Sequence, residues 1–158
     1  MKTITDIIAP IQLLSGSHAD VGATGQGCFM NVIAYLNGES QITDESTCVC
    51  VTVRPIAVWL NDYLRDDERA ILIPYIERAM GSATSDLVTI TSRANRAVQM
   101  ANEMAEYAAE SAEYAGYAAA MREAIFQAGL DYLEKVCNPP QEVNQEIIVR
   151  ANKLLALA

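Results

Sequence analysis

The sequence predicts a mainly α fold: a compact helical N-terminal half with a short extended segment, packed on a long alanine-rich helical hairpin or coiled coil. Three observations support this prediction. Helix-start and helix-stop residues recur along the first half, residues 86–137 contain no proline, and alanine, the best helix former, dominates the second half. We divide the chain near Gly81 into residues 1–82 and 83–158, which together form one structural unit.

The first half begins with two expected helices and an extended segment. Residues 4–14 resemble a helix with Thr5 as its N-cap. Residues 27–37 form an apolar helix that we place in the core, and Gly38 stands where a helix-terminating glycine belongs. The β-branched residues of 48–53 predict a short strand or another extended segment.

Two further helices are expected before the division. The first covers residues 55–64 and has a proline at its first position, where proline is well tolerated. The second covers residues 67–80, with Asp66 or Asp67 as its cap and a kink at Pro74. A glycine follows this helix and should end it.

The second half is expected to be almost entirely helical. Ser85 is a plausible N-cap for residues 86–137, which form either one continuous helix or two helices broken near Gly116. The prolines that follow Asn138 end this run, and residues 141–157 form a last short helix.

A heptad seam runs along the same region, beside a stripe of small residues that lets a neighbouring helix approach closely. Because exposed methionine and tyrosine seams rarely stay uncovered, we expect the seam to be covered within one chain or in a homodimer, and we favour the homodimer. The seam consists of Ala97, Met100, Met104, Tyr107, Ser111, Tyr114, Ala118, Met121, Ile125, Ala128 and Tyr132. The stripe consists of Ala101, Ala105, Ala108, Ala112, Ala115 and Ala119.

The charge of the chain restricts its partners. With 20 acidic and 11 basic residues the net charge is −9, which argues against direct binding to nucleic acid or anionic lipid. No apolar run is long enough to span a membrane, and Asp6 and Pro10 interrupt any signal-peptide pattern. Four cysteines without an export signal are typical of free thiols or metal ligands, so we expect a cytoplasmic location.

The first half contains one compact group of candidate metal ligands. His18, Cys28, Cys48 and Cys50 lie close together in sequence, and zinc prefers four such nitrogen and sulfur ligands. Their spacing is not that of a standard zinc finger, and free cysteine is often simply a buried apolar residue. A zinc site and a set of buried thiols therefore both remain open, as does a nucleophilic pair of Cys28 and His18.

The second half contains an acidic stripe on one helix face. It consists of Glu103, Glu106, Glu110 and Glu113, and it lies next to Tyr107 and Tyr114 of the seam. One interpretation is a solvated face that keeps an alanine-rich helix soluble. The other is a docking surface for a basic protein partner, because carboxylates spaced along a rigid helix can mimic backbone phosphates.

Several short motifs resemble a type of small uncharacterised protein from bacterial and phage genomes. They are the GSH of 16–18, GQGCFMNVIAYLNGE, TD, CVC and LND, followed by the alanine-rich second half. The resemblance implies no activity, but it favours a defined site around His18, Cys28 and Cys48. This chain has Asn31 where that pattern often has glutamate after the methionine, which weakens any role for the position as an acid or ligand.

Three function classes follow. The leading one is a non-enzymatic interaction protein without a cofactor, whose acidic helical surface binds a basic protein partner, as a phage-type inhibitor of a nucleic-acid-binding machine would. The second is a small protein with a structural zinc ion. The third is a cysteine-dependent enzyme.

Overall fold

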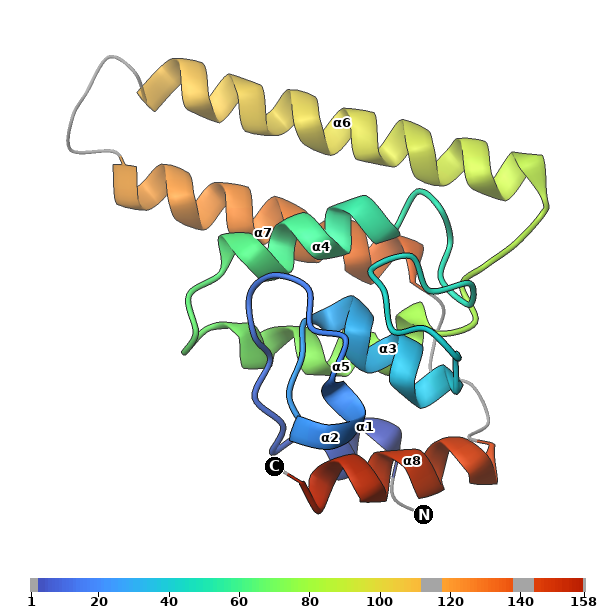
Figure 1. Ribbon diagram of the computed structural model, residues 1–158. Coiled ribbons are helices and arrows are strands. Elements are labelled where there is room, and N and C mark those ends of the chain that lie inside the picture. The colour runs from blue at the N-terminus through green and yellow to red at the C-terminus, as the bar shows by residue number, and fades with distance from the viewer. Residues whose placement is uncertain (1–2, 112–117, 138–143, 158) are drawn as a thin grey trace.

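The computed structural model describes residues 3–111, 118–137 and 144–157 and confirms the prediction of a mainly α fold (Figure 1). The described residues contain no strand. The helices stack on one another, with α6 at one end of the molecule and α8 at the other (Figure 1). The elements are α1 (Ile4–Ile8), α2 (Val21–Thr24), α3 (Phe29–Asn37), α4 (Arg54–Tyr63), η1 (Arg69–Leu72), α5 (Ile73–Ala79), α6 (Leu87–Ser111), α7 (Ala118–Val136) and α8 (Gln145–Leu155).

The first helix is shorter than predicted, and its cap is Thr3 and not Thr5. The Thr3 hydroxyl accepts from the Asp6 N–H at 3.0 Å, and the Asp6 carboxylate accepts from the Thr3 N–H at 2.9 Å. The prediction was wrong beyond Ile8, because Pro10 has no N–H with which to continue the helix. The chain instead runs alongside Gly27, whose carbonyl accepts from the Leu14 N–H at 3.0 Å.

The α3 helix is buried and ends as predicted. Gly38 has φ +75°, in the left-handed region, and its N–H bonds to the carbonyls of the last turn. The Leu36 carbonyl in the same turn accepts a hydrogen bond from Arg150 Nε at 2.6 Å. Because Arg150 lies in α8, this bond ties the C-terminal helix to the core helix.

The prediction of an extended segment at 48–53 is wrong. These residues form consecutive turns, in which the Val53 N–H donates to the Cys50 carbonyl at 2.9 Å. Val49 and Val53 are buried, so their β-branched side chains pack in the core although the segment does not pair with a strand. The turns lead directly into α4, which has Pro55 in its first turn as predicted.

The helix predicted over 67–80 is divided in two. A 3-10 turn, η1, precedes α5, and Pro74 lies in the first turn of α5, where its missing N–H costs nothing, so it does not kink a longer helix. Neither Asp66 nor Asp67 caps η1, since Glu68 precedes it without a side-chain cap. Asp66 instead forms an ion pair with Arg69.

The alanine-rich region forms two helices that lie side by side and run in opposite directions (Figure 1). The cap of α6 is Asp86 and not Ser85, because the Asp86 carboxylate accepts from the Val88 and Thr89 N–H groups. The expected break at Gly116 lies outside the described residues. Within them, Met100 and Tyr132 of the heptad seam are buried in the core of this chain, whereas Ala97, Met104, Ile125 and Ala128 are half-buried.

One hydrophobic core joins both halves of the chain. It includes Leu36 and Leu60 from the first half and Leu133 and Leu154 from the second. Gly129 lets α7 approach α4 closely, since a Cβ on it would lie 2.9 Å from Leu60 Cδ1. Among the described residues, no helix is both long and apolar enough to cross a membrane.

Candidate functional site

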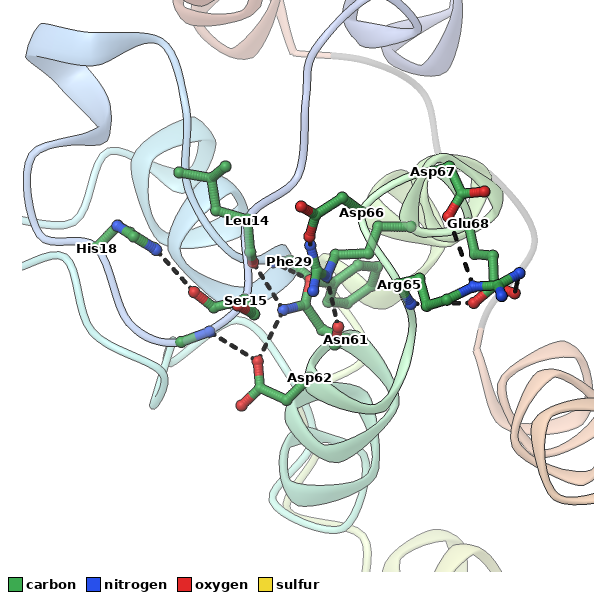
Figure 2. A network of polar contacts seen from close by, with 12 residues as sticks. Leu14, Ser15, His18, Phe29, Asn61, Asp62, Arg65, Asp66, Asp67 and Glu68 are labelled. Carbon is green, nitrogen blue, oxygen red and sulfur yellow. Dashed lines mark hydrogen bonds and ion pairs between the residues drawn. The ribbon is translucent and has the colours of Figure 1, made fainter. Parts of the chain in front are cut away.

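A buried asparagine of α4 fixes the N-terminal loop against the core (Figure 2). The Asn61 side-chain oxygen accepts from the Phe29 N–H at 3.2 Å, and its Nδ2 donates to the Leu14 carbonyl at 2.9 Å. The neighbouring Asp62 carboxylate accepts from the Gly16 N–H at 2.8 Å. The LND and GSH motifs, far apart in the sequence, therefore meet in one network.

A second buried asparagine forms the other half of this network. The Asn31 side-chain oxygen accepts from the His18 N–H, and its Nδ2 donates to Asp44 Oδ1 at 3.0 Å and to Ser17 Oγ at 3.5 Å. The Cys28 thiol, at the N-cap of α3, donates to the same Asp44 oxygen at 3.3 Å. His18 reaches the network through its backbone, while its ring Nε2 lies 2.8 Å from the Ser15 carbonyl.

The amide of Asn31 suits its surroundings better than a carboxylate would. It donates to Asp44 and accepts from His18, and a carboxylate can only accept. A glutamate at this position would also place a second negative charge beside Asp44.

The four predicted zinc ligands do not come together. Cys28 contacts Asp44, whereas the Cys48 sulfur lies 3.2 Å from Ser46 Oγ and the Cys50 sulfur 3.3 Å from Thr52 Oγ1. Over residues 3–111, 118–137 and 144–157, no group of three or more histidine, cysteine, aspartate or glutamate side chains could hold a metal ion. The geometry of this structure thus gives the zinc hypothesis no site at His18 and these cysteines.

Most of the thiols are in environments that keep them protonated. Burial, with a smaller contribution from the Asp44 carboxylate, raises the pKa of Cys28 to about 12. Burial likewise raises the pKa of Cys48, and that of Cys137 to about 11. Burial also acts on Cys50, but hydrogen bonds from Thr52 and Arg93 outweigh it and lower the pKa of that thiol. A nucleophilic Cys28 would need a thiolate, which this environment disfavours.

The structure describes part of the acidic stripe. The Glu106 side chain is exposed on α6, and that of Glu103 is half-buried, with its carboxylate accepting from Gln99 Nε2 at 3.1 Å. Tyr107 and Glu110 belong to α6, but the structure does not describe their side chains. Glu113 and Tyr114 lie outside the described residues.

From Leu87 to Ala105, the outward surface of the same helix contains no charge. We call it the outer face of α6. At 100° per residue its members lie opposite the core-facing residues such as Met100. Leu87, Val88 and Val98 are 75%, 77% and 60% exposed. All members but the half-buried Ala94 are exposed, and they are Leu87, Val88, Thr91, Ala94, Asn95, Val98, Ala101, Asn102 and Ala105.

Part of this surface was visible in the sequence. Ala101 and Ala105 belong to the alanine stripe that we expected to contact another helix. The large aliphatic members at the start of α6 were missed, because only the structure shows which side of the helix α7 and the core cover.

Comparison of the chain with protein-family models, with curated proteins and with solved structures finds no match. The resemblance to small bacterial and phage proteins therefore stays a prediction from the motifs.

Proposed function

We propose that this chain is a non-enzymatic interaction protein that binds a basic, helical partner on the outer face of α6. The observation that supports this most is the composition of that face. In a chain with 20% charged residues, nine positions on the exposed side of a surface helix contain no charge. A helix face that only meets solvent is normally charged or strongly polar.

The large aliphatic side chains point to a protein contact. An exposed leucine or valine is ordinary when it stands alone, but Leu87 and Val98 lie three helical turns apart on the same side of α6, and Val88 adjoins Leu87. Exposed apolar side chains with polar surroundings are typical of interaction sites. The small residues Ala101 and Ala105 would let the backbone of a partner helix approach closely.

The charges beside this face favour a basic partner. Glu106 comes directly after Ala105, at the C-terminal end of the outer face, and Glu103 lies about one helical turn before it. Lysine or arginine side chains on the flank of a partner helix would reach both. A second copy of this chain would also have a net charge of −9, so long-range repulsion opposes a homodimer and attraction steers a basic protein.

A protein that binds nucleic acid is a basic partner of this kind. In that case the chain would act as an inhibitor by occupying the basic surface. The alternative of a cysteine-dependent enzyme has less support, because Cys28 is buried and its thiol donates a hydrogen bond to Asp44.

Affinity capture from cells that contain the chain, with quantitative mass spectrometry, tests this proposal. Val98→Asp places a charge in the centre of the outer face, and Glu106→Lys reverses the charge at its edge. We expect both variants to lose the main captured protein, which should have a basic surface and should elute with rising salt. Glu45→Lys is the matched control, because Glu45 is exposed and distant in sequence.

The proposal fails if Val98→Asp and Glu106→Lys capture the same proteins as the unaltered chain. It also fails if the chain captures only further copies of itself. Circular dichroism of each variant checks that the helices are intact.

A further inference from the structure

A basic groove lies where the start of α6 passes the end of α7. Its volume is about 850 Å³. The described lining comes from one side of α6 and from the last residues of α7 and the residue that follows. These residues are Val88, Thr89, Ser92, Arg93, Asn95, Arg96, Gln99, Lys135, Val136 and Cys137.

The groove concentrates positive charge in a chain that is acidic as a whole. Arg93, Arg96 and Lys135 line it, and its described lining includes no aspartate or glutamate. None of these three cations belongs to an ion pair among the described residues. Five other arginines do form ion pairs there, and they are Arg65, Arg69, Arg78, Arg122 and Arg150.

Arg93 gives this arrangement its second, independent support. Its side chain is 8% exposed, and one Nη donates to the Ser82 carbonyl at 2.6 Å. It also forms a hydrogen bond with Cys50, which lowers the pKa of that thiol. A buried cation is costly unless it is paired and hydrogen-bonded, and no carboxylate of the described residues forms an ion pair with Arg93. The guanidinium therefore lies at the groove without a carboxylate partner among the described residues.

We propose that this groove binds a small molecule that carries a phosphate group. A phosphate monoester has a charge of about −1.5 to −2 at neutral pH and three strong acceptor oxygens, which match two guanidinium groups and one ammonium group. Thr89, Ser92 and Asn95 supply neutral hydrogen-bonding groups for the rest of the molecule. The volume lies within the range of small-molecule sites and exceeds the needs of free phosphate.

The surroundings of the groove select for a small anion over a polyanion. The chain has a net charge of −9, and the acidic Glu103 and Glu106 lie further along the same helix. An extended nucleic acid or an anionic membrane would meet this negative surface outside the groove. A ligand within the groove contacts Arg93, Arg96 and Lys135, whereas Glu103 reaches the lining only through the hydrogen bond that its carboxylate accepts from Gln99.

Titration of the ¹⁵N-labelled full chain followed by amide NMR tests the proposal. The probes are inorganic phosphate, AMP as a phosphate monoester, succinate and a polyglutamate peptide, all at constant ionic strength. We expect saturable shifts for phosphate and AMP at the amides of 88–99 and 135–137. Arg96→Gln and Lys135→Gln should each weaken AMP binding by about tenfold, as removal of a charged hydrogen-bond partner does. Arg93 is left unchanged, because it also holds Ser82.

Lys153→Gln is the matched control, because it removes the same charge from an exposed position on α8. The proposal is overturned if AMP and phosphate give no saturable shifts at the groove, or if Lys153→Gln weakens binding as much as Arg96→Gln. The proposal is also overturned if succinate or polyglutamate binds at the groove and phosphate does not. Glu106→Lys, which tests the outer face of α6 and lies about 10 Å along the helix from Gln99, should leave AMP binding unchanged, so the two proposals fail separately.

Discussion

At the scale of single residues, the Asn61 side chain provides hydrogen-bond partners for two backbone groups. Its side chain pairs the Phe29 N–H at the start of α3 with the Leu14 carbonyl of the N-terminal loop. Both groups would otherwise be backbone polar groups without a partner, which a folded chain rarely tolerates in its interior.

The variant Asn61→Ala should therefore destabilise the protein by about 3 kcal/mol, since it leaves two polar groups unpaired. Urea denaturation measures this change in the free energy of unfolding. Asn102→Ala, at an exposed position of α6, is the control and should change it by less than about 0.5 kcal/mol. Equal effects of the two variants would contradict the role assigned to Asn61.

The Cys28 thiol should be unreactive in the folded protein. Its pKa is raised from 9.0 to about 12, so at pH 8 its thiolate fraction falls by about a thousandfold relative to an unshifted thiol. The expected result is negligible alkylation of Cys28 by iodoacetamide at pH 8 and full alkylation in urea, measured by peptide mass spectrometry. Rapid alkylation of Cys28 in the folded protein would favour the cysteine-dependent enzyme instead.

The sequence identified the residues of this network without predicting their contacts. The GSH, TD and LND motifs drew attention to the right positions, but the site expected nearby was a metal site of His18, Cys28, Cys48 and Cys50. Asn31 and Asn61 were not chosen as central, because an asparagine in a sequence looks the same whether it is exposed or buried. The loop closure that pairs Leu13 with Gly27 decides the question, and it is a tertiary contact.

At the scale of helices, the close approach of α7 to α4 depends on a glycine. A Cβ at Gly129 would lie 2.9 Å from Leu60 Cδ1 and 3.5 Å from the Trp59 ring. Glycine within a helix costs about 1 kcal/mol relative to alanine, so its presence in α7 is explained by this packing.

Gly129→Val should destabilise the protein by about 1–3 kcal/mol, because the larger side chain must displace the core residues of α4. The matched variant Gln127→Val introduces the same side chain at an exposed position of α7 and should have a smaller effect. Thermal and urea unfolding distinguish them. A Gly129→Val protein at least as stable as the unaltered chain would show that the two helices do not pack as described.

Glu68 links α7 to the turn before η1, and this link should depend on pH. Its carboxylate accepts from the Arg122 guanidinium at 2.6 and 2.9 Å and from the Arg65 N–H at 3.0 Å. Hydrogen bonds from Arg122, then from Arg65, lower the pKa of Glu68 from 4.5 to about 2. Because the folded-state pKa is lower, the stabilisation is complete above pH 4.5 and disappears as the pH falls toward 2.

The variant Glu68→Gln should thus be less stable than the unaltered chain at neutral pH, and the difference should vanish near pH 2. Urea midpoints measured across this pH range give the comparison, with Glu45→Gln as the control at an exposed glutamate. A difference that does not change with pH would mean that the carboxylate charge of Glu68 is not what stabilises the link.

Helix boundaries were predictable where local chemistry sets them. Gly38 ends α3 and Pro55 opens α4 as the sequence indicates, because a left-handed glycine and a first-turn proline act on their own backbone. The strand expected at 48–53 was not found, since a strand needs a second strand to pair with, and Val49 and Val53 could be buried without one.

At the scale of the whole molecule, the distribution of charge is more informative than the net value of −9. The net charge predicted a basic partner and argued against direct nucleic-acid binding. It did not predict that one side of α6 is uncharged or that three cations line one groove beside it. These patterns need the relative placement of α6 and α7, which no local sequence signal provides.

The central claim is that the outer face of α6 contacts another protein. A photo-crosslinking residue in place of Val98, introduced in cells, tests it most directly, with the same residue in place of Glu45 for comparison. We expect adducts from position 98 with a protein that has a basic surface, and few or none from position 45. Adducts only between copies of this chain, or equal labelling from both positions, would contradict it.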